Sequence, residues 1–396
     1  MATVTPNSYV ADRDPDVEPA ETEHRVTPLE LFFDLVFVLA ITQVTQLLAD
    51  DPSWRGLARG MLILGMLWWA WAAYAWLTNE IDPDEGGARL AMFAAAAGML
   101  IVSLAVPGAF NENAFEFAIA YTFVRAMHIG VWLVATSDDT ARRQIVMLAP
   151  TSFIGCALLF AASFTDGTTQ GLLWAAALVI DYAGGAVGGN QGYRLHPAHF
   201  VERHGLIIII ALGESIVALG VGASSSAELE GDEIASALLG MIVAASLWWT
   251  YFDVTALVAE RRLSSLRGAA RNRLARDSFS YLHFPMVAGI VLLALGIKKT
   301  LGHPDHVLET IPAVALCGGV GLFFLAHVAR RLRAMHTFGT HRFIAALLCF
   351  ALIPAALELE GLQTLALLAV LTSALVGYEY WRFHESRARL RASAHA

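Results

Sequence analysis

The chain has 396 residues, of which 57% are hydrophobic and only 15% are charged, against roughly 25% charged in an average soluble domain. This composition excludes an ordinary soluble enzyme or binding module and predicts an all-α polytopic membrane protein. The formal net charge of −9, with the basic residues confined to short loops, argues against a nucleic-acid partner. The three cysteines lie in apolar runs without metal-ligand or disulfide spacing: Cys156, Cys317 and Cys349.

The first 29 residues are polar and acidic and lack a basic segment followed by a cleavage site, so we expect no removable signal peptide. Because a bilayer crossing needs about 20 apolar helical residues, the remaining sequence predicts about twelve transmembrane helices. The predicted spans are 31–49, 58–78, 89–107, 115–135, 144–164, 171–188, 203–222, 235–257, 279–297, 308–329, 342–358 and 362–381.

The distribution of basic residues predicts the orientation of these spans. Of the 26 Lys and Arg residues, 21 lie on the side of the N-terminus and four on the other side. Cytoplasmic loops carry the excess of basic residues, so both termini should be cytoplasmic. The predicted segments are an acidic arm 1–29, a six-helix half 30–188, a connector 189–202, a second six-helix half 203–382 and a basic tail 383–396.

The two halves resemble each other in short stretches. GMLWWAW (65–71) is similar to ASLWWTY (245–251), and FAAAAGML (93–100) is similar to FPMVAGIV (284–291). A third pair, RRQI and HRFI at 341–344, follows in the same order. These matches predict two parallel six-helix repeats, an arrangement that places a pathway or pocket between them.

Two acids stand in the first predicted span, ELFFDLVFVLAIT. Glu30 and Asp34 are one helical turn apart and therefore share a face. Glu30 follows Thr27-Pro28, so it is either a helix cap or part of a site. A carboxylate inside a bilayer is costly, so Asp34 marks either a functional pathway or a buried salt bridge.

The fourth span carries the basic residue that lies deepest in any span. Arg125 and His128 are three residues apart on one face, and Arg125 needs an acid partner, for which Asp34 and Asp181 are the candidates. Such a pair serves either a pathway or helix packing. His128 is either a proton carrier or a packing residue.

The most polar stretch follows Asp181. Five glycines between 184 and 192 predict an unwound segment at a site or, alternatively, a flexible connector between the halves.

Three polar residues, His199, Glu202 and His204, stand at the start of the seventh span. His199 and Glu202 have a spacing used by metal sites, but no second matching pair follows, so we assign no metal. Glu214 lies deep in an apolar run and is the strongest candidate in the second half, with Ser215 beside it.

Asp253 and His283 are weaker candidates in the eighth and ninth spans. No phosphate-binding, dinucleotide-binding, nucleophile-elbow or HExxH motif occurs, so the cofactor is left unassigned.

Two blocks identify a family. RVTPLELFFDLVFVLAITQ (25–43) and HFVERHGLIIIIALGESIVALG (199–220) resemble the signature blocks of the bacterial low-temperature-requirement A (LtrA) family. The resemblance implies a multi-pass protein of the bacterial inner membrane linked to growth in the cold, but no reaction. Glu30, Asp34, Glu202 and Glu214 are the acids that match those blocks.

The first block also looks like the first-helix motif of a potassium-channel family with two six-span repeats. Phe33 replaces the serine of that motif, and Arg25 stands farther upstream than that family's arginine. Both departures weaken the likeness to a channel.

Three functions remain open. The first is a transporter or channel-like protein in which Asp34, Glu214 and Asp181 line a pathway for an ion or solute. The second is a membrane-embedded enzyme that acts on a lipid or isoprenoid by carboxylate acid–base chemistry. The third is a structural or sensory stress protein, and a homo-oligomer is compatible with all three.

Overall fold

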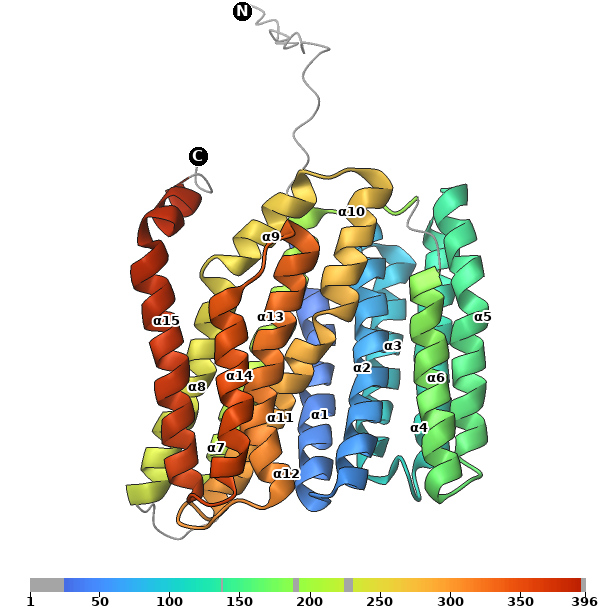
Figure 1. Ribbon diagram of the computed structural model, residues 1–396. Coiled ribbons are helices and arrows are strands. Elements are labelled where there is room, and N and C mark those ends of the chain that lie inside the picture. Colours follow the sequence, from blue (N-terminus) through green and yellow to red (C-terminus); the bar gives the residue numbers. More distant parts are fainter. Residues whose placement is uncertain (1–24, 137, 188–191, 224–230, 393–396) are drawn as a thin grey trace, which may run out of the picture.

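The computed structural model describes residues 25–136, 138–187, 192–223 and 231–392 as a bundle of long helices that run side by side (Figure 1). Within these ranges the only β pairing is an isolated bridge between Val307 and Glu360. The helices are α1 (Pro28–Asp50), α2 (Trp54–Glu80), α3 (Gly86–Ala105), α4 (Ala114–Ala135), α5 (Asp139–Ala162), α6 (Gly167–Val187), α7 (Pro197–Ala223), α8 (Gly231–Phe252), α9 (Thr255–Ser264), α10 (Gly268–Ala275), α11 (Phe284–Gly302), α12 (Thr310–Ala313), α13 (Gly319–Met335), α14 (Thr340–Ala356) and α15 (Gly361–Ala392).

Nine helices in the described part of the chain are long and apolar enough to cross a membrane. The chain is therefore a multi-pass membrane protein. Each of the twelve predicted spans overlaps one long helix, but the nine do not include α6, α7 or α14, which has only 17 residues. Membrane crossing by these three helices stays a prediction.

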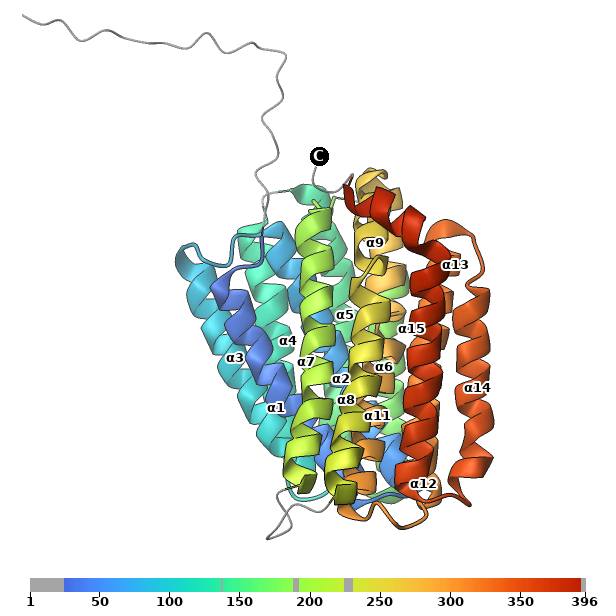
Figure 2. The same ribbon diagram turned by 90° about the vertical axis from the view of Figure 1, so that its left-hand side faces the viewer.

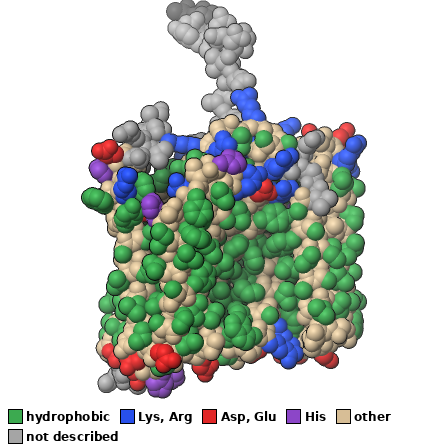
Figure 3. All heavy atoms as spheres, in the orientation of Figure 1, with side chains coloured by type: hydrophobic (Ala, Val, Ile, Leu, Met, Phe, Trp, Pro, Cys, Tyr) green, Lys and Arg blue, Asp and Glu red, His purple; other side chains and the backbone are tan. Residues whose placement is uncertain are grey.

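The surface supports a membrane position for the bundle. Hydrophobic side chains form a broad band around the middle in Figure 3, and Lys and Arg side chains gather along the edge where both ends of the chain lie (Figures 1 and 3). Such a band can face hydrocarbon, while the two polar edges face water and lipid headgroups.

Local sequence signals determine where the first helix begins. Thr27 accepts a hydrogen bond from the Glu30 backbone N–H, and the Glu30 side chain accepts one from the Thr27 N–H, with Pro28 in the first turn. This capping box satisfies backbone donors that a helix start would otherwise leave unpaired. Glu30 and Asp34, which are one turn apart on α1, are both buried in the bundle.

Two of the predicted segments overlap helices of the structure. Helix α7 begins at Pro197, within the predicted connector 189–202, and α15 continues to Ala392, within the predicted tail 383–396. The α15 helix kinks at Phe383, where φ is −117°, and then continues. These boundaries were placed where the apolar runs begin and end. A helix can extend beyond an apolar run, and both Pro197 in a first turn and the polar sequence at the end of α15 are compatible with helix.

The unwound segment expected at 184–192 is wrong for its first part. Gly184 and Gly185 lie within α6, where a Cβ on Gly184 would stand 2.0 Å from the Thr151 hydroxyl oxygen on α5. These glycines therefore allow close packing of helices rather than unwinding. Residues 188–191 of this prediction lie outside the described residues, and Gly192 has a φ of +82°.

Helices α1, α2, α7 and α11 meet at the centre of the bundle. Figure 2 shows α7 between α1 and α8, and α11 packs against α1, α2, α7 and α13. The crossing of α11 and α13 is tight, since a Cβ on Gly289 would lie 2.5 Å from the Gly319 carbonyl oxygen. Helix α13 is thus packed closely on α11, one of the four helices that meet at the centre.

Candidate functional site

A buried cluster of charged side chains joins α1 to α7. Arg203 donates to Glu30 Oε1 at 2.5 Å and to Asp34 Oδ1 at 2.7 Å. His199 Nε2 lies 3.0 Å from Glu30 Oε2. The side chains of Glu30, Asp34 and Arg203 are at most 1% exposed. We call Glu30, Asp34, His199 and Arg203 the central cluster.

Helix α2 supplies the residues that orient this cluster. Trp71 Nε1 donates to Asp34 Oδ1 at 2.9 Å, and Thr78 Oγ1 accepts from Arg203 Nη1 at 2.9 Å. Asn79 lies 2.9 Å from His199 Nδ1 through its amide nitrogen, and its amide oxygen accepts from the His196 backbone N–H. The amide is therefore oriented as a donor to Nδ1, which leaves the His199 proton on Nε2, facing Glu30.

The central cluster lacks one positive charge. Two carboxylates share one guanidinium, and His199 is neutral because its Nδ1 accepts a hydrogen bond. Asp34 Oδ2 has no hydrogen-bond partner in the described part of the chain. An uncompensated buried charge is energetically costly. The net charge of the cluster becomes zero if one of the two acids is protonated or if one monovalent cation binds there.

Glu214 lies on the same helix interface, farther from the termini. It accepts a short hydrogen bond from Thr42 of α1 and is 3% exposed. From Asp34 to Thr42 the α1 axis rises about 12 Å, and the intervening contact is apolar: Phe37, Ile41, Ile207 and Ala211 are buried there. The interface thus carries two polar sites separated by a hydrophobic barrier.

A second ion pair lies inside the first half, away from this interface. Arg125 Nη2 of α4 is 3.0 Å from Asp181 Oδ1 of α6, and Ser152 of α5 donates to the same carboxylate oxygen at 2.8 Å. Of the two acids expected as partners, Asp181 therefore pairs with Arg125, and Asp34 does not. His128 packs between the rings of Tyr74 and Trp132, at centroid distances of 5.5 and 5.6 Å.

Buried histidines extend from the central cluster toward the second half. The His204 ring lies 4.9 Å from that of Trp71 and 5.3 Å from that of His283. His283 Nε2 lies 2.8 Å from the Tyr251 hydroxyl, and its Nδ1 lies 3.1 Å from the Ser278 carbonyl oxygen, to which it must donate. Tyr251 therefore donates to His283.

Two of the predicted site residues lie elsewhere. Glu202 is exposed on α7 and accepts from the Val26 backbone N–H at 3.3 Å. Asp253, at the end of α8, forms an ion pair with Arg387 of α15. The described residues contain no group of three or more His, Cys, Asp or Glu side chains that could hold a metal ion.

Sequence reasoning missed Arg203, the residue on which the central cluster depends. Arg203 was not singled out among the polar residues at the start of the seventh span, where it follows Glu202 and precedes the apolar run. The available signal was its spacing, because His199 and Arg203 repeat the four-residue interval of Glu30 and Asp34. Two helices with polar stripes of equal spacing and complementary charge are expected to face each other.

The fold and these contacts define a polytopic all-helical membrane protein whose central helices meet through buried ion pairs. The chain belongs to the family of bacterial low temperature requirement A proteins (LtrA), whose family model matches residues 25–377. The membership expected from the two signature blocks is confirmed.

One relative extends this comparison without adding an activity. Over 373 residues the chain is 27% identical to an uncharacterized protein of Rhizobium meliloti (strain 1021), a match that covers 89% of this chain and 90% of that protein. No solved structure matches the chain.

Proposed function

We propose that this protein is a transporter of the bacterial inner membrane in which the central cluster carries a coupling proton or monovalent cation. The observation that carries the proposal is the charge deficit of the cluster, where the two carboxylates of Glu30 and Asp34 share the single guanidinium of Arg203. A purely structural pair needs no such deficit. Intramembrane acids with an exchangeable proton are typical of pumps and transporters.

We further propose twelve spans in two parallel six-helix repeats, with the cluster on the axis between them. His199 and Arg203 of α7 each meet the α1 residue 169 positions earlier, Glu30 and Asp34. Two helices related by an axis along the membrane normal would bring equivalent residues together in this way.

Helix neighbours support the same repeat. In the first half α1 packs on α3, α3 on α4, and α4 on α5. In the second half α7 packs on α11, α11 on α13, and α13 on α14 in the corresponding order. The similar stretches noted in the sequence fall on α2 and α8, α3 and α11, and α5 and α14, which agrees with this correspondence.

Both termini are proposed to be cytoplasmic. The basic residues gather at the edge of the bundle where the two ends lie (Figure 3), and cytoplasmic loops carry such an excess. In this orientation the central cluster lies toward the cytoplasm, and Glu214 lies beyond the hydrophobic barrier.

The interface favours a gated transporter over an open channel. Phe37 and Ile41 are buried between the two polar sites and separate the central cluster from Glu214. Movement of an ion past them requires the two halves to shift, as in alternating access. A lipid-directed enzyme has less support, because Glu30, Asp34 and Glu214 do not line either of two prominent cavities in the described part of the bundle.

The test is flux in proteoliposomes that contain wild type, Asp34→Asn, Glu214→Gln or the exposed control Asp305→Asn. An interior pH-sensitive dye reports proton movement under an imposed pH gradient, and tracer uptake is measured for a panel of monovalent cations. We expect wild type and Asp305→Asn to move protons or one of the cations, and both buried-acid variants to lose that movement.

Two results would contradict the proposal. One is the absence of any flux from wild type that is folded and uniformly oriented in the vesicles. The other is flux in Asp34→Asn equal to that in wild type, since this variant removes the charge deficit and with it the coupling site.

A further inference from the structure

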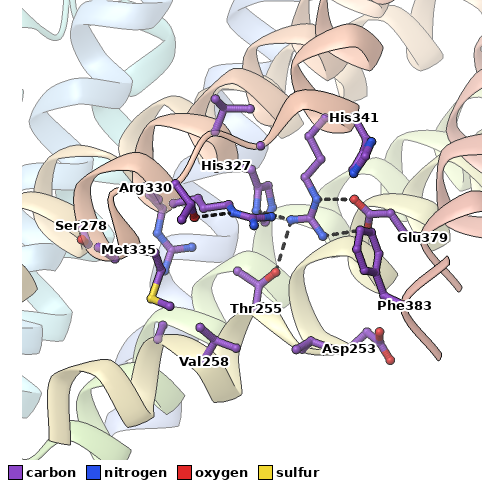
Figure 4. A pocket seen from close by; sticks show the side chains of 18 of the residues that line it. Asp253, Thr255, Val258, Ser278, His327, Arg330, Met335, His341, Glu379 and Phe383 are labelled. Carbon is purple, nitrogen blue, oxygen red and sulfur yellow. Dashed lines mark hydrogen bonds and ion pairs between the residues drawn. The ribbon is translucent and has the colours of Figure 1, made fainter. Parts of the chain in front are cut away.

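A cavity of about 340 Å³ lies in the second half, at the end of the bundle where both termini lie (Figures 1 and 4). It is bounded by the end of α8, by α9, by the final turns of α13, by the start of α14 and by the last part of α15. Its walls are partly apolar, with Val258, Leu263, Val328 and Met335 among the lining residues. It is separate from the central cluster.

The cavity has more positive than negative charge. Among the described residues that line it are four arginines, Arg330, Arg331, Arg342 and Arg387, and two acids, Asp253 and Glu379. Both acids are already neutralised: Arg342 binds Glu379 through two hydrogen bonds of 2.8 and 2.9 Å, and Arg387 pairs with Asp253.

Arg330 is the buried cation of this cavity without an acid. It is 5% exposed, and no carboxylate in the described ranges lies within ion-pair distance of it. Its guanidinium lies over the rings of Phe279 and Tyr251, 4.8 and 5.6 Å from their centroids, and its Nε has no hydrogen-bond partner in the described part of the chain. A buried guanidinium cannot lose its proton, so an anion is the means of balancing it.

His327 supplies a second donor on the same cavity. Its Nδ1 lies 2.9 Å from Arg342 Nη1, and because arginine only donates, Nδ1 must accept. The imidazole proton is therefore on Nε2, which is buried and has no partner within the described residues. Figure 4 shows that His327 and Arg330 line the same pocket. Two residues that line one cavity thus each have a buried donor atom, Arg330 Nε and His327 Nε2, without an acceptor among the described residues.

We propose that this cavity binds a phosphate-bearing anion, and that its occupant is the headgroup of an anionic phospholipid. A phosphate diester supplies one negative charge for Arg330 and acceptor oxygens for its guanidinium and for His327. The apolar wall accommodates the start of an acyl chain. The basic edge of the bundle and the exposed aromatic residues Tyr380 and Trp381 of α15 favour a position at headgroup level. The proposal does not depend on transport.

The test is native mass spectrometry of the purified full chain titrated with phosphatidylglycerol or with phosphatidylcholine of the same acyl chains. We expect wild type to bind one phosphatidylglycerol about tenfold or more tightly than phosphatidylcholine, the ratio that one charge-assisted contact supplies. Arg330→Gln should remove this preference and Arg330→Lys should keep part of it. Arg382→Gln, which removes an exposed charge on α15 outside the cavity, should leave the preference unchanged.

A second variant keeps the test decisive if Arg330→Gln does not fold. Val258→Trp fills the cavity from its apolar wall without removing a charge, and it should also lower phosphatidylglycerol binding. Competition by inorganic phosphate separates the two sources of the anion: full displacement at equal concentration would assign the site to free phosphate and overturn the lipid occupant. Wild type without a preference, or folded Arg330→Gln with the wild-type preference, would overturn the site itself.

Discussion

Two buried arginines show how differently this molecule uses charge inside a membrane. In the first half, Arg125 has one carboxylate, Asp181, and a serine hydroxyl that donates to the same oxygen. Between the halves, Arg203 has two carboxylates, Glu30 and Asp34. At each of the two sites one carboxylate oxygen, Asp181 Oδ2 or Asp34 Oδ2, has no hydrogen-bond partner among the described residues. Both arginines are fully buried.

The difference lies in charge balance rather than in burial. A one-to-one pair is neutral as it stands, so it has no reason to bind or release a proton, and its role is to hold α4 and α6 together. A two-to-one cluster is neutral only with an additional positive charge. Burial alone does not separate structure from function here, whereas the ratio of acids to bases does.

The largest effect is expected where the balanced pair is broken. Asp181→Asn leaves Arg125 as a buried cation that cannot lose its proton, which should lower the free energy of unfolding by about 3–5 kcal/mol. Thermal unfolding in detergent, followed by the loss of monodisperse protein, measures this cost. The double variant Arg125→Gln/Asp181→Asn should recover part of it, and an Asp181→Asn protein as stable as wild type would show that the pair is not the structural link we describe.

A smaller effect is expected for Arg203→Gln, although it leaves two acids without their cation. Carboxylates can take up protons and become neutral, which arginine cannot, so the loss should be about 1–3 kcal/mol, as for an unsatisfied buried group. The same unfolding assay compares it with Asp181→Asn. A greater loss for Arg203→Gln than for Asp181→Asn would contradict the explanation by protonation.

Much of the fold could be predicted from the sequence, because the length and apolarity of a spanning helix leave few alternatives. All twelve predicted ranges overlap a long helix, and the interruption expected at Gly184 failed because glycine serves both unwinding and close packing. Composition does not distinguish these two uses. The contact that decides between them, with Thr151 on another helix, is a property of the folded chain.

The candidate site was less predictable, since it depends on which helices face each other. The sequence indicated Glu30, Asp34 and His199 as polar residues in or near spans, but it did not reveal Arg203 as their shared partner. Glu202 and Arg203 are adjacent charged residues near the start of a helix, and the sequence alone does not distinguish their environments. Glu202 is exposed, whereas Arg203 is fully buried. Successive side chains of an α-helix differ in direction by about 100°, and this angle places the two residues of α7 in different environments.

The most direct comparison makes the same substitution, aspartate to asparagine, at an acid that contacts the second arginine, Arg203. Asp34→Asn removes one of two acids and leaves Arg203 paired with Glu30 alone, which is the arrangement of Arg125 and Asp181. The free energy of unfolding should therefore change by less than about 1 kcal/mol, because the asparagine still accepts the hydrogen bond from Trp71 and no charge is left unbalanced.

Asp34→Asn and Asp181→Asn thus form a matched pair of isosteric changes, both at buried aspartates that contact an arginine. We expect opposite outcomes in two assays: Asp181→Asn unfolds early, whereas Asp34→Asn keeps its stability and loses coupled flux. If Asp34→Asn costs as much stability as Asp181→Asn, the cluster does not hold an extra positive charge in the folded protein. Glu30 and Asp34 would then both be needed as permanent anions, and the α1–α7 contact would be a structural link of the same kind as the Arg125 pair.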